Sequence, residues 1–225
     1  MKRKNNLYPA LYDLRNIEKV FNEICSNTNN KVKVANFKEY KCIYISRIYE
    51  MLKNKNYQVG PYHVFFIFEP KKRRIVSQTL VDKIVNHLVA RYILYPSLLP
   101  CLLECNVASR KGMGTKAGIK LFHRFRNYFQ LKYGTYYILK VDIHNFFGSI
   151  NHDILKKKLL RKIKDKDALN ILFSIIDSDE VGLSIGNMTS QILAIFFLND
   201  LDHFIKESLK IKRICKVSRR FFVIS

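Results

Sequence analysis

The segment Tyr136–Ile150 constrains the fold most, because it joins a strand-forming run to an acid and an aromatic turn. Residues 136–141 are mostly aromatic and aliphatic, which is typical of a strand lying half-buried in a sheet. Asp142 follows directly, so its carboxylate would lie at the rim of that sheet, within reach of a metal ion. The simpler interpretation is that Asp142 caps the turn that follows. This segment alone leaves both interpretations open.

The charge of the chain indicates the class of partner. It has 40 Lys and Arg against 18 Asp and Glu, a net charge of +22 over 225 residues. Such an excess favours an anionic partner, nucleic acid first and a membrane surface second. No run approaches the roughly 20 apolar residues of a spanning helix. The basic N-terminus also lacks the apolar core of a signal peptide. We therefore expect a soluble, cytoplasmic protein.

The five cysteines are scattered and lack the paired spacing of a zinc site. They are Cys25, Cys42, Cys101, Cys105 and Cys215. We expect buried, reduced thiols.

Apolar periodicity divides the rest of the chain into helices and one hairpin. Helical spacing covers residues 11–24, 37–52, 80–94, 116–131, 155–163, 168–176 and 189–210. Pro96 and Pro100 are expected to end the third of these, and Asn151 to cap the fifth. Tyr62–Phe68 predicts a strand, and Glu69–Val76 returns from it with four consecutive cations. These cations are either solvated surface or a clamp for a triphosphate.

Two glycine-containing loops hold further candidate contacts. In the loop 105–114, Arg110 and Lys111 stand beside glycines, a composition that suits phosphate contacts and also occurs in ordinary loops. The loop 182–191 leads into a helix. Its backbone N–H groups could bind a phosphate or simply begin that helix.

Four blocks, taken in order, resemble the reverse transcriptase family over nearly the whole chain. They are the hairpin 69–75 with Asp82 after it, the segment 107–115, Asp142 with residues 146–152, and the loop 182–191 with residues 198–202. Ile185-Gly186 and Ser190-Gln191 resemble the branch that contains the diversity-generating retroelements, among relatives of bacterial group II intron enzymes.

The resemblance implies an α+β fold: the fingers and partial palm of a right-hand polymerase, helix-rich, with a small antiparallel palm sheet and no thumb. The implied domains are residues 1–135 for the N-terminal region and fingers, and residues 136–225 for the partial palm.

The resemblance also implies RNA-directed DNA polymerisation with two Mg²⁺ ions (or Mn²⁺), template RNA, a DNA primer and dNTPs. Asp142 would be the catalytic metal ligand, with the backbone carbonyl of Ile143 as a second ligand. Phe147 would stack under the sugar and select deoxynucleotides. Further dNTP contacts would be Lys71, Arg73, Arg74, Ile185, Gly186 and Gln191, and the nucleic-acid contacts Arg110 and Lys111.

The family's second metal motif, two adjacent aspartates on a hairpin, should fall near residues 217–221. The chain has Arg219 and Arg220 there. Arginines would repel metal ions, so we expect the chain to be inactive alone. Without that hairpin, the Asp142 strand should keep an exposed edge and the fold should be marginally stable.

A shifted reading frame would explain the arginines. If residues 216–221 are encoded by AAG GTA TCA AGA CGA TTT, the frame one nucleotide later encodes Arg-Tyr-Gln-Asp-Asp. The expectation is then a frameshifted, truncated form of a complete enzyme. The alternatives are a non-catalytic nucleic-acid-binding remnant and a relative of the abortive-infection polymerases that act without a template.

Overall fold

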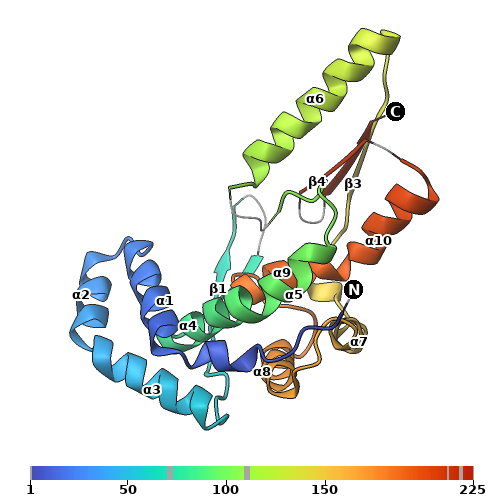
Figure 1. The fold of residues 1–225 in the computed structure, drawn as a ribbon. Coiled ribbons are helices and arrows are strands. Elements are labelled where there is room, and N and C mark those ends of the chain that lie inside the picture. Colours follow the sequence, from blue (N-terminus) through green and yellow to red (C-terminus); the bar gives the residue numbers. More distant parts are fainter. Residues whose placement is uncertain (1, 70–72, 109–111, 212, 218–219, 225) are drawn as a thin grey trace.

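The computed structural model describes residues 2–69, 73–108, 112–211, 213–217 and 220–224, with only the backbone at 73–74, 217, 220–221 and 223–224. Helices predominate, and the strands form two small antiparallel sheets (Figure 1). The expected helix-rich α+β class is confirmed.

The α-helices are α1 (Leu14–Ser26), α2 (Lys31–Glu39), α3 (Lys41–Lys53), α4 (Leu80–Val89), α5 (Tyr95–Leu98), α6 (Thr115–Tyr133), α7 (His152–Leu160), α8 (Lys166–Ile176), α9 (Met188–Phe197) and α10 (Asn199–His203). The strands are β1 (His63–Ile67), β2 (Arg73–Ser77), β3 (Ile138–Asp142), β4 (Ile214–Val217) and β5 (Arg220–Ile224). Short 3-10 turns cover Tyr8–Leu11, Leu99–Cys101 and Phe147–Ser149, and π-helical turns cover Ala90–Leu94 and Phe204–Ser208.

The main core forms where α4 packs against α1 on one side and α9 on the other. Its residues have the helical spacing read from the sequence: Ile17 and Phe21 on α1, and Ile84 and Leu88 on α4, are all fully buried. The core draws residues from both sides of position 135. The proposed division into two domains at that position stays a prediction.

Three predicted helices differ in extent. The helix from residue 80 continues past Pro96 to Leu98, because the π-helical turn at 90–94 leaves room for a residue without an N–H. The predicted helix 189–210 breaks at Leu198, where φ is −85° and ψ is 0°. The predicted stripe 37–52 falls on α2 and α3, which meet at Tyr40. The cap at Asn151 is confirmed, since its side chain accepts the Ile154 N–H at 3.0 Å.

All five cysteines are free thiols, but their burial differs from the expectation at two positions. Cys42 is exposed in the first turn of α3, whereas the buried Ile48 and Leu52 lie further along that helix. Cys101 is half-buried. Within the described residues, no helix combines the length and apolar character needed to cross a membrane.

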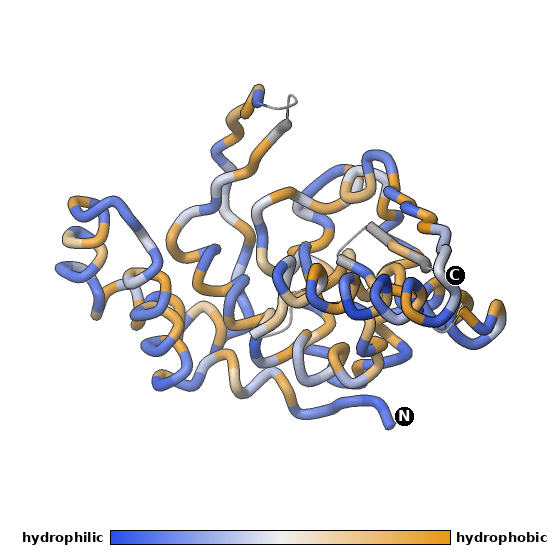
Figure 2. Tube along the Cα trace, turned by 90° about the horizontal axis from the view of Figure 1, so that it is seen from above, coloured by the Kyte–Doolittle hydropathy of each residue, from blue (hydrophilic) through white to orange (hydrophobic). Residues whose placement is uncertain are grey.

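The first sheet is a two-stranded hairpin in which β1 pairs antiparallel with β2, with His63 opposite Ser77 and Ile67 opposite Arg73. The hairpin projects from the helical body, and Figure 2 shows hydrophobic residues along it. Val64, Phe65 and Phe66 are each more than two-fifths exposed.

The second sheet has the strand order β3-β5-β4, all antiparallel. Ile138 lies opposite Ile224, and Asp142 lies opposite Arg220. The expectation that the Asp142 strand would lack this neighbour is therefore wrong. The run Arg220–Ile224 is itself β-branched and aromatic enough to pair along the whole of β3, whatever residues precede it.

Side chains alternate across β4, and a different helix covers each face. The Cys215 thiol approaches the Gly118 carbonyl of α6 at 3.3 Å. The next residue, Lys216, points to the opposite face and contacts Asp202 of α10. Lys216 also exchanges backbone hydrogen bonds with Cys105 and Val107 at 3.0 and 3.2 Å. Residues 105–107 thus cover the outer edge of β4.

Candidate active site

Asp142 ends β3 with an exposed side chain, as predicted for a carboxylate at the rim of the sheet. Ile143 after it is half-buried. Asn145 then adopts a left-handed conformation (φ 43°), which Asn tolerates better than most residues, and the chain turns back toward the core. The roles of Asp142 and of the Ile143 carbonyl as metal ligands stay predictions.

The turn after Asp142 is anchored by its first aromatic residue and leaves the second more accessible. Phe146 is only 2% exposed and belongs to the main core. Phe147 is half-buried, and the two rings lie edge to face with centroids 5.7 Å apart. The ring of Phe147 is therefore held by its neighbour while part of it remains open to a ligand.

The loop between α8 and α9 connects the Phe147 turn to β2. The Leu183 N–H donates to the Phe147 carbonyl at 2.8 Å. Two residues on, the Ile185 carbonyl accepts the Val76 N–H at 3.4 Å. Ile185 itself is 42% exposed, and Gly186 has a φ of 125° that favours glycine. The structure thus brings Phe147, Ile185 and Gly186 to one loop cluster beside the first sheet.

Gly182 makes the tightest approach in this cluster. Its φ is 71°, and a Cβ there would overlap the Phe147 carbonyl oxygen and the Gly148 backbone. We expect Gly182→Ala to lower the free energy of unfolding by roughly 3 kcal/mol, because it adds a backbone clash to the cost of a positive φ. Gly134→Ala is the matched control. Gly134 has a φ of 72° with nothing near its missing Cβ, so only about 1 kcal/mol should be lost. Equal losses in urea unfolding would contradict the close approach.

Gly186 and Gln191 also line an open groove of about 480 Å³ between this loop, β2 and the N-terminal helices. Lys33 of α2 and Lys83 of α4 bring positive charge to it, and Gln78 adds polar groups. Burial lowers the pKa of His87, with Lys83 and Arg91 adding to the effect, so this lining side chain is mostly neutral at pH 7. The sequence singled out neither lysine, because Lys33 is one of several lysines in α2 and Lys83 lies within the mostly apolar run of α4.

Asp82 has a structural role. It is the acid that follows the hairpin 69–75 in the first block of the resemblance. It is 2% exposed and accepts hydrogen bonds from the Tyr57 hydroxyl at 2.8 Å, the Gly60 N–H at 3.2 Å and the Thr79 hydroxyl at 2.5 Å. Burial, and then the Asp82 charge, raise the pKa of Tyr57. Asp82 therefore joins the start of α4 to the segment before β1.

Several of the predicted cationic contacts cannot be located. Lys71, Arg110 and Lys111 lie outside the described residues. For Arg73 and Arg74, β2 gives only the backbone, paired with Ile67 and Phe66. Their proposed contacts with a triphosphate or a template stay predictions.

The residues around Asp142 do not fit a pair of metal ions. The register puts Arg220 opposite Asp142, where a second acid would be needed. Within the described ranges, no group of three or more His, Cys, Asp or Glu side chains could hold a metal.

A buried ion pair between β4 and α10 was not predicted from the sequence. Lys216 Nζ lies 2.7 and 2.6 Å from the two carboxylate oxygens of Asp202, and their side chains are 0% and 1% exposed. Burial raises the pKa of Asp202 and lowers that of Lys216, while their mutual attraction opposes both shifts. One feature of the sequence could have indicated this ion pair: a lysine lies between Cys215 and Val217 in an otherwise apolar strand.

Comparison with known proteins gives one curated relative and a related fold. No protein-family profile matches the sequence. The COX1/OXI3 intron 1 protein of Saccharomyces cerevisiae is 23% identical over 232 residues, which cover 96% of this chain and 27% of that protein.

Among solved structures, telomerase from Candida albicans, in complex with the TWJ fragment of telomeric RNA, matches with a TM-score of 0.57. The match has 13% identity and covers 83% of this chain and 42% of that chain. At this identity the likeness is one of fold. The chain thus has weak homology to an intron protein and a fold similar to part of a telomerase.

Proposed function

We propose that the chain is a fingers-and-palm portion of a reverse-transcriptase-type polymerase that binds nucleic acid and, with its present residues, does not transfer nucleotides. The observation that carries this proposal is the β3–β5 register, which aligns Arg220 of the central strand β5 with Asp142 at the end of β3. The fold supports the polymerase relationship, and the arginine at this position argues against metal-dependent catalysis.

Charge supports the nucleic-acid partner. The net charge of +22 needs an anionic counterpart, and Lys33 and Lys83 bring part of it to the groove beside Gly186 and Gln191. We propose that this groove receives single-stranded template RNA. In a form with both metal-binding acids, Asp142 would hold the metal ions, Phe147 would contact the sugar of a dNTP, and Ile185 would offer it no hydrogen bond.

Binding of single-stranded RNA should depend on the groove lysines. We expect Lys83→Glu and Lys33→Glu each to weaken binding and to reduce the slope of log K against log [salt] by roughly 0.7 or more, because each variant loses a phosphate contact. Lys166→Glu, at the exposed start of α8, makes the same charge change away from the groove. Fluorescence anisotropy at four or more salt concentrations measures the slopes. Equal losses in all three variants would show that general charge, rather than the groove, binds RNA.

A further inference from the structure

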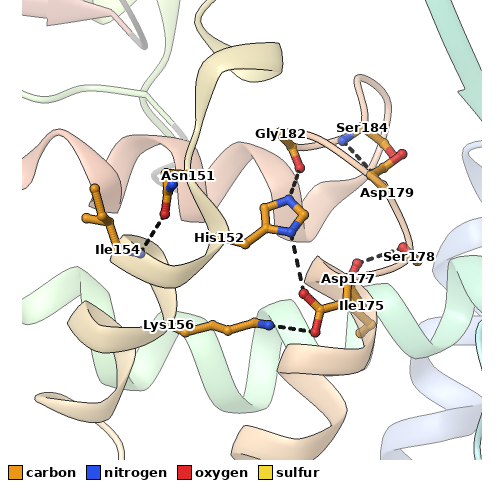
Figure 3. Close-up of polar contacts among 10 residues, drawn as sticks. All are labelled: Asn151, His152, Ile154, Lys156, Ile175, Asp177, Ser178, Asp179, Gly182 and Ser184. Carbon is orange, nitrogen blue, oxygen red and sulfur yellow. Dashed lines mark hydrogen bonds and ion pairs between the residues drawn. The ribbon is translucent and has the colours of Figure 1, made fainter.

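His152 connects the start of α7 to two other segments (Figure 3). Its Nε2 lies 2.5 Å from the Gly182 carbonyl oxygen, and because that oxygen only accepts, Nε2 donates. Its Nδ1 lies 3.4 Å from an Asp177 carboxylate oxygen at the end of α8. The His152 side chain is 14% exposed, so these contacts are partly shielded from water.

The hydrogen bond to Gly182 fixes one peptide unit from both ends. The carbonyl of Gly182 and the N–H of Leu183 belong to the same planar group. His152 holds the carbonyl, and the Phe147 carbonyl accepts the N–H at 2.8 Å. Rotation of this peptide would break both hydrogen bonds together. Because Gly182 lacks a Cβ, the peptide can sit directly against the Phe147–Gly148 backbone.

The rest of the loop is fixed by contacts that do not involve His152. Asp179 accepts hydrogen bonds from both the backbone N–H and the hydroxyl of Ser184 (Figure 3). Lys156 pairs with Asp177 at 2.6 Å, where the Asp177 side chain is 49% exposed. These contacts shape the loop, whereas the 182–183 peptide joins it to the Phe147 turn.

We propose that His152 is a positioning residue which, through the Gly182–Leu183 peptide, fixes the turn that presents Phe147. The inference rests on the proposed function for its consequence, because the Phe147 ring is the proposed contact for the nucleotide sugar. A mobile turn would let the ring yield to a 2′-hydroxyl, so loss of His152 should relax discrimination between deoxy- and ribonucleotides.

Amide hydrogen exchange in the chain as it stands tests the positioning role without catalysis. Asn in place of His can mimic only Nδ1, whereas Gln can carry a donor near the Nε2 position. We expect His152→Asn to speed exchange of the Leu183 and Ser149 amides roughly tenfold and His152→Gln to change it by less than about threefold. Lys156→Met, which removes only the outer ion pair, should leave both amides unchanged, as should every variant at the Ala168 amide on α8. Unchanged exchange in His152→Asn, or equal acceleration by Asn and Gln, would overturn the proposal.

The consequence is measured in a protein with both hairpin acids restored. There, His152→Asn should lower the preference for dNTPs over rNTPs roughly tenfold, and His152→Gln should preserve it. Faster exchange with an unchanged preference would overturn the link to the sugar. If the acid-restored parent extends no primer, the proposed function fails, while the exchange data still decide whether His152 positions the turn.

Discussion

Mg²⁺-dependent primer extension is the expected result of four substitutions made together: Val217→Tyr, Ser218→Gln, Arg219→Asp and Arg220→Asp. We expect no extension without them. Two carboxylates from different strands are needed to hold two metal ions that stabilise in-line phosphoryl transfer. β3 supplies one at Asp142, and the register brings position 220 of β5 opposite it. Val217 and Arg220 are themselves paired, so positions 217 and 220 lie at one end of the β4–β5 pairing.

The assay is addition of one dNTP to a DNA primer on template RNA, with protein in excess and with Mg²⁺ or Mn²⁺. Adding Asp142→Ala to the restored variant should lower the rate by at least roughly 10³-fold, because it removes the carboxylate on β3. Val217→Tyr with Ser218→Gln alone is the matched control: it changes the hairpin but keeps both arginines and should stay inactive. Extension by the unaltered chain, with or without a template, would contradict the proposal that Arg219 and Arg220 prevent catalysis.

The DNA that encodes the hairpin tests the origin of the two arginines independently. If the frame has shifted, the codons of residues 216–221 should match AAG GTA TCA AGA CGA TTT closely enough that the next frame encodes two adjacent aspartates. Codons for Arg219 and Arg220 that cannot yield Asp-Asp in another frame would contradict this origin, whatever the primer-extension assay shows.

Breaking the buried pair of Lys216 and Asp202 is expected to cause the largest loss of stability. Lys216→Met or Asp202→Leu alone should lower the free energy of unfolding by about 3–5 kcal/mol, because each leaves one charge buried without its partner. The two substitutions together should restore most of that loss, since the desolvation cost of both charges disappears. Urea unfolding of the four proteins gives the coupling energy directly.

An exposed ion pair supplies the control for this cycle. Lys55 and Asp167 lie 2.6 Å apart with side chains 57% and 38% exposed, so Lys55→Met should cost far less than either single substitution in the buried pair. A single substitution at Lys216 or Asp202 that costs no more than this would show that the pair is hydrated. The outcome also bears on the candidate active site, because Lys216 lies in β4, which pairs with the Arg220 strand β5.

Features set by neighbouring residues could be predicted from the sequence. The strand that ends at Asp142, the cap at Asn151 and the glycine loop at Gly182 all appear where the sequence indicates them. Each depends on backbone preference or on a side chain that bonds within three residues. Longer elements were less predictable: apolar spacing alone could not show that Leu198 divides one helix into two.

Contacts between distant segments were decided only by the tertiary structure. The sequence by itself determined a basic, helix-rich chain with an acid at a strand end and two arginines where a second metal motif would lie. Packing between segments 14 to 78 residues apart decided three contacts. Arg220 pairs opposite Asp142, Lys216 binds Asp202, and His152 binds the Gly182 carbonyl. No local preference specifies such partners, because the contacts form only when the core brings the elements together.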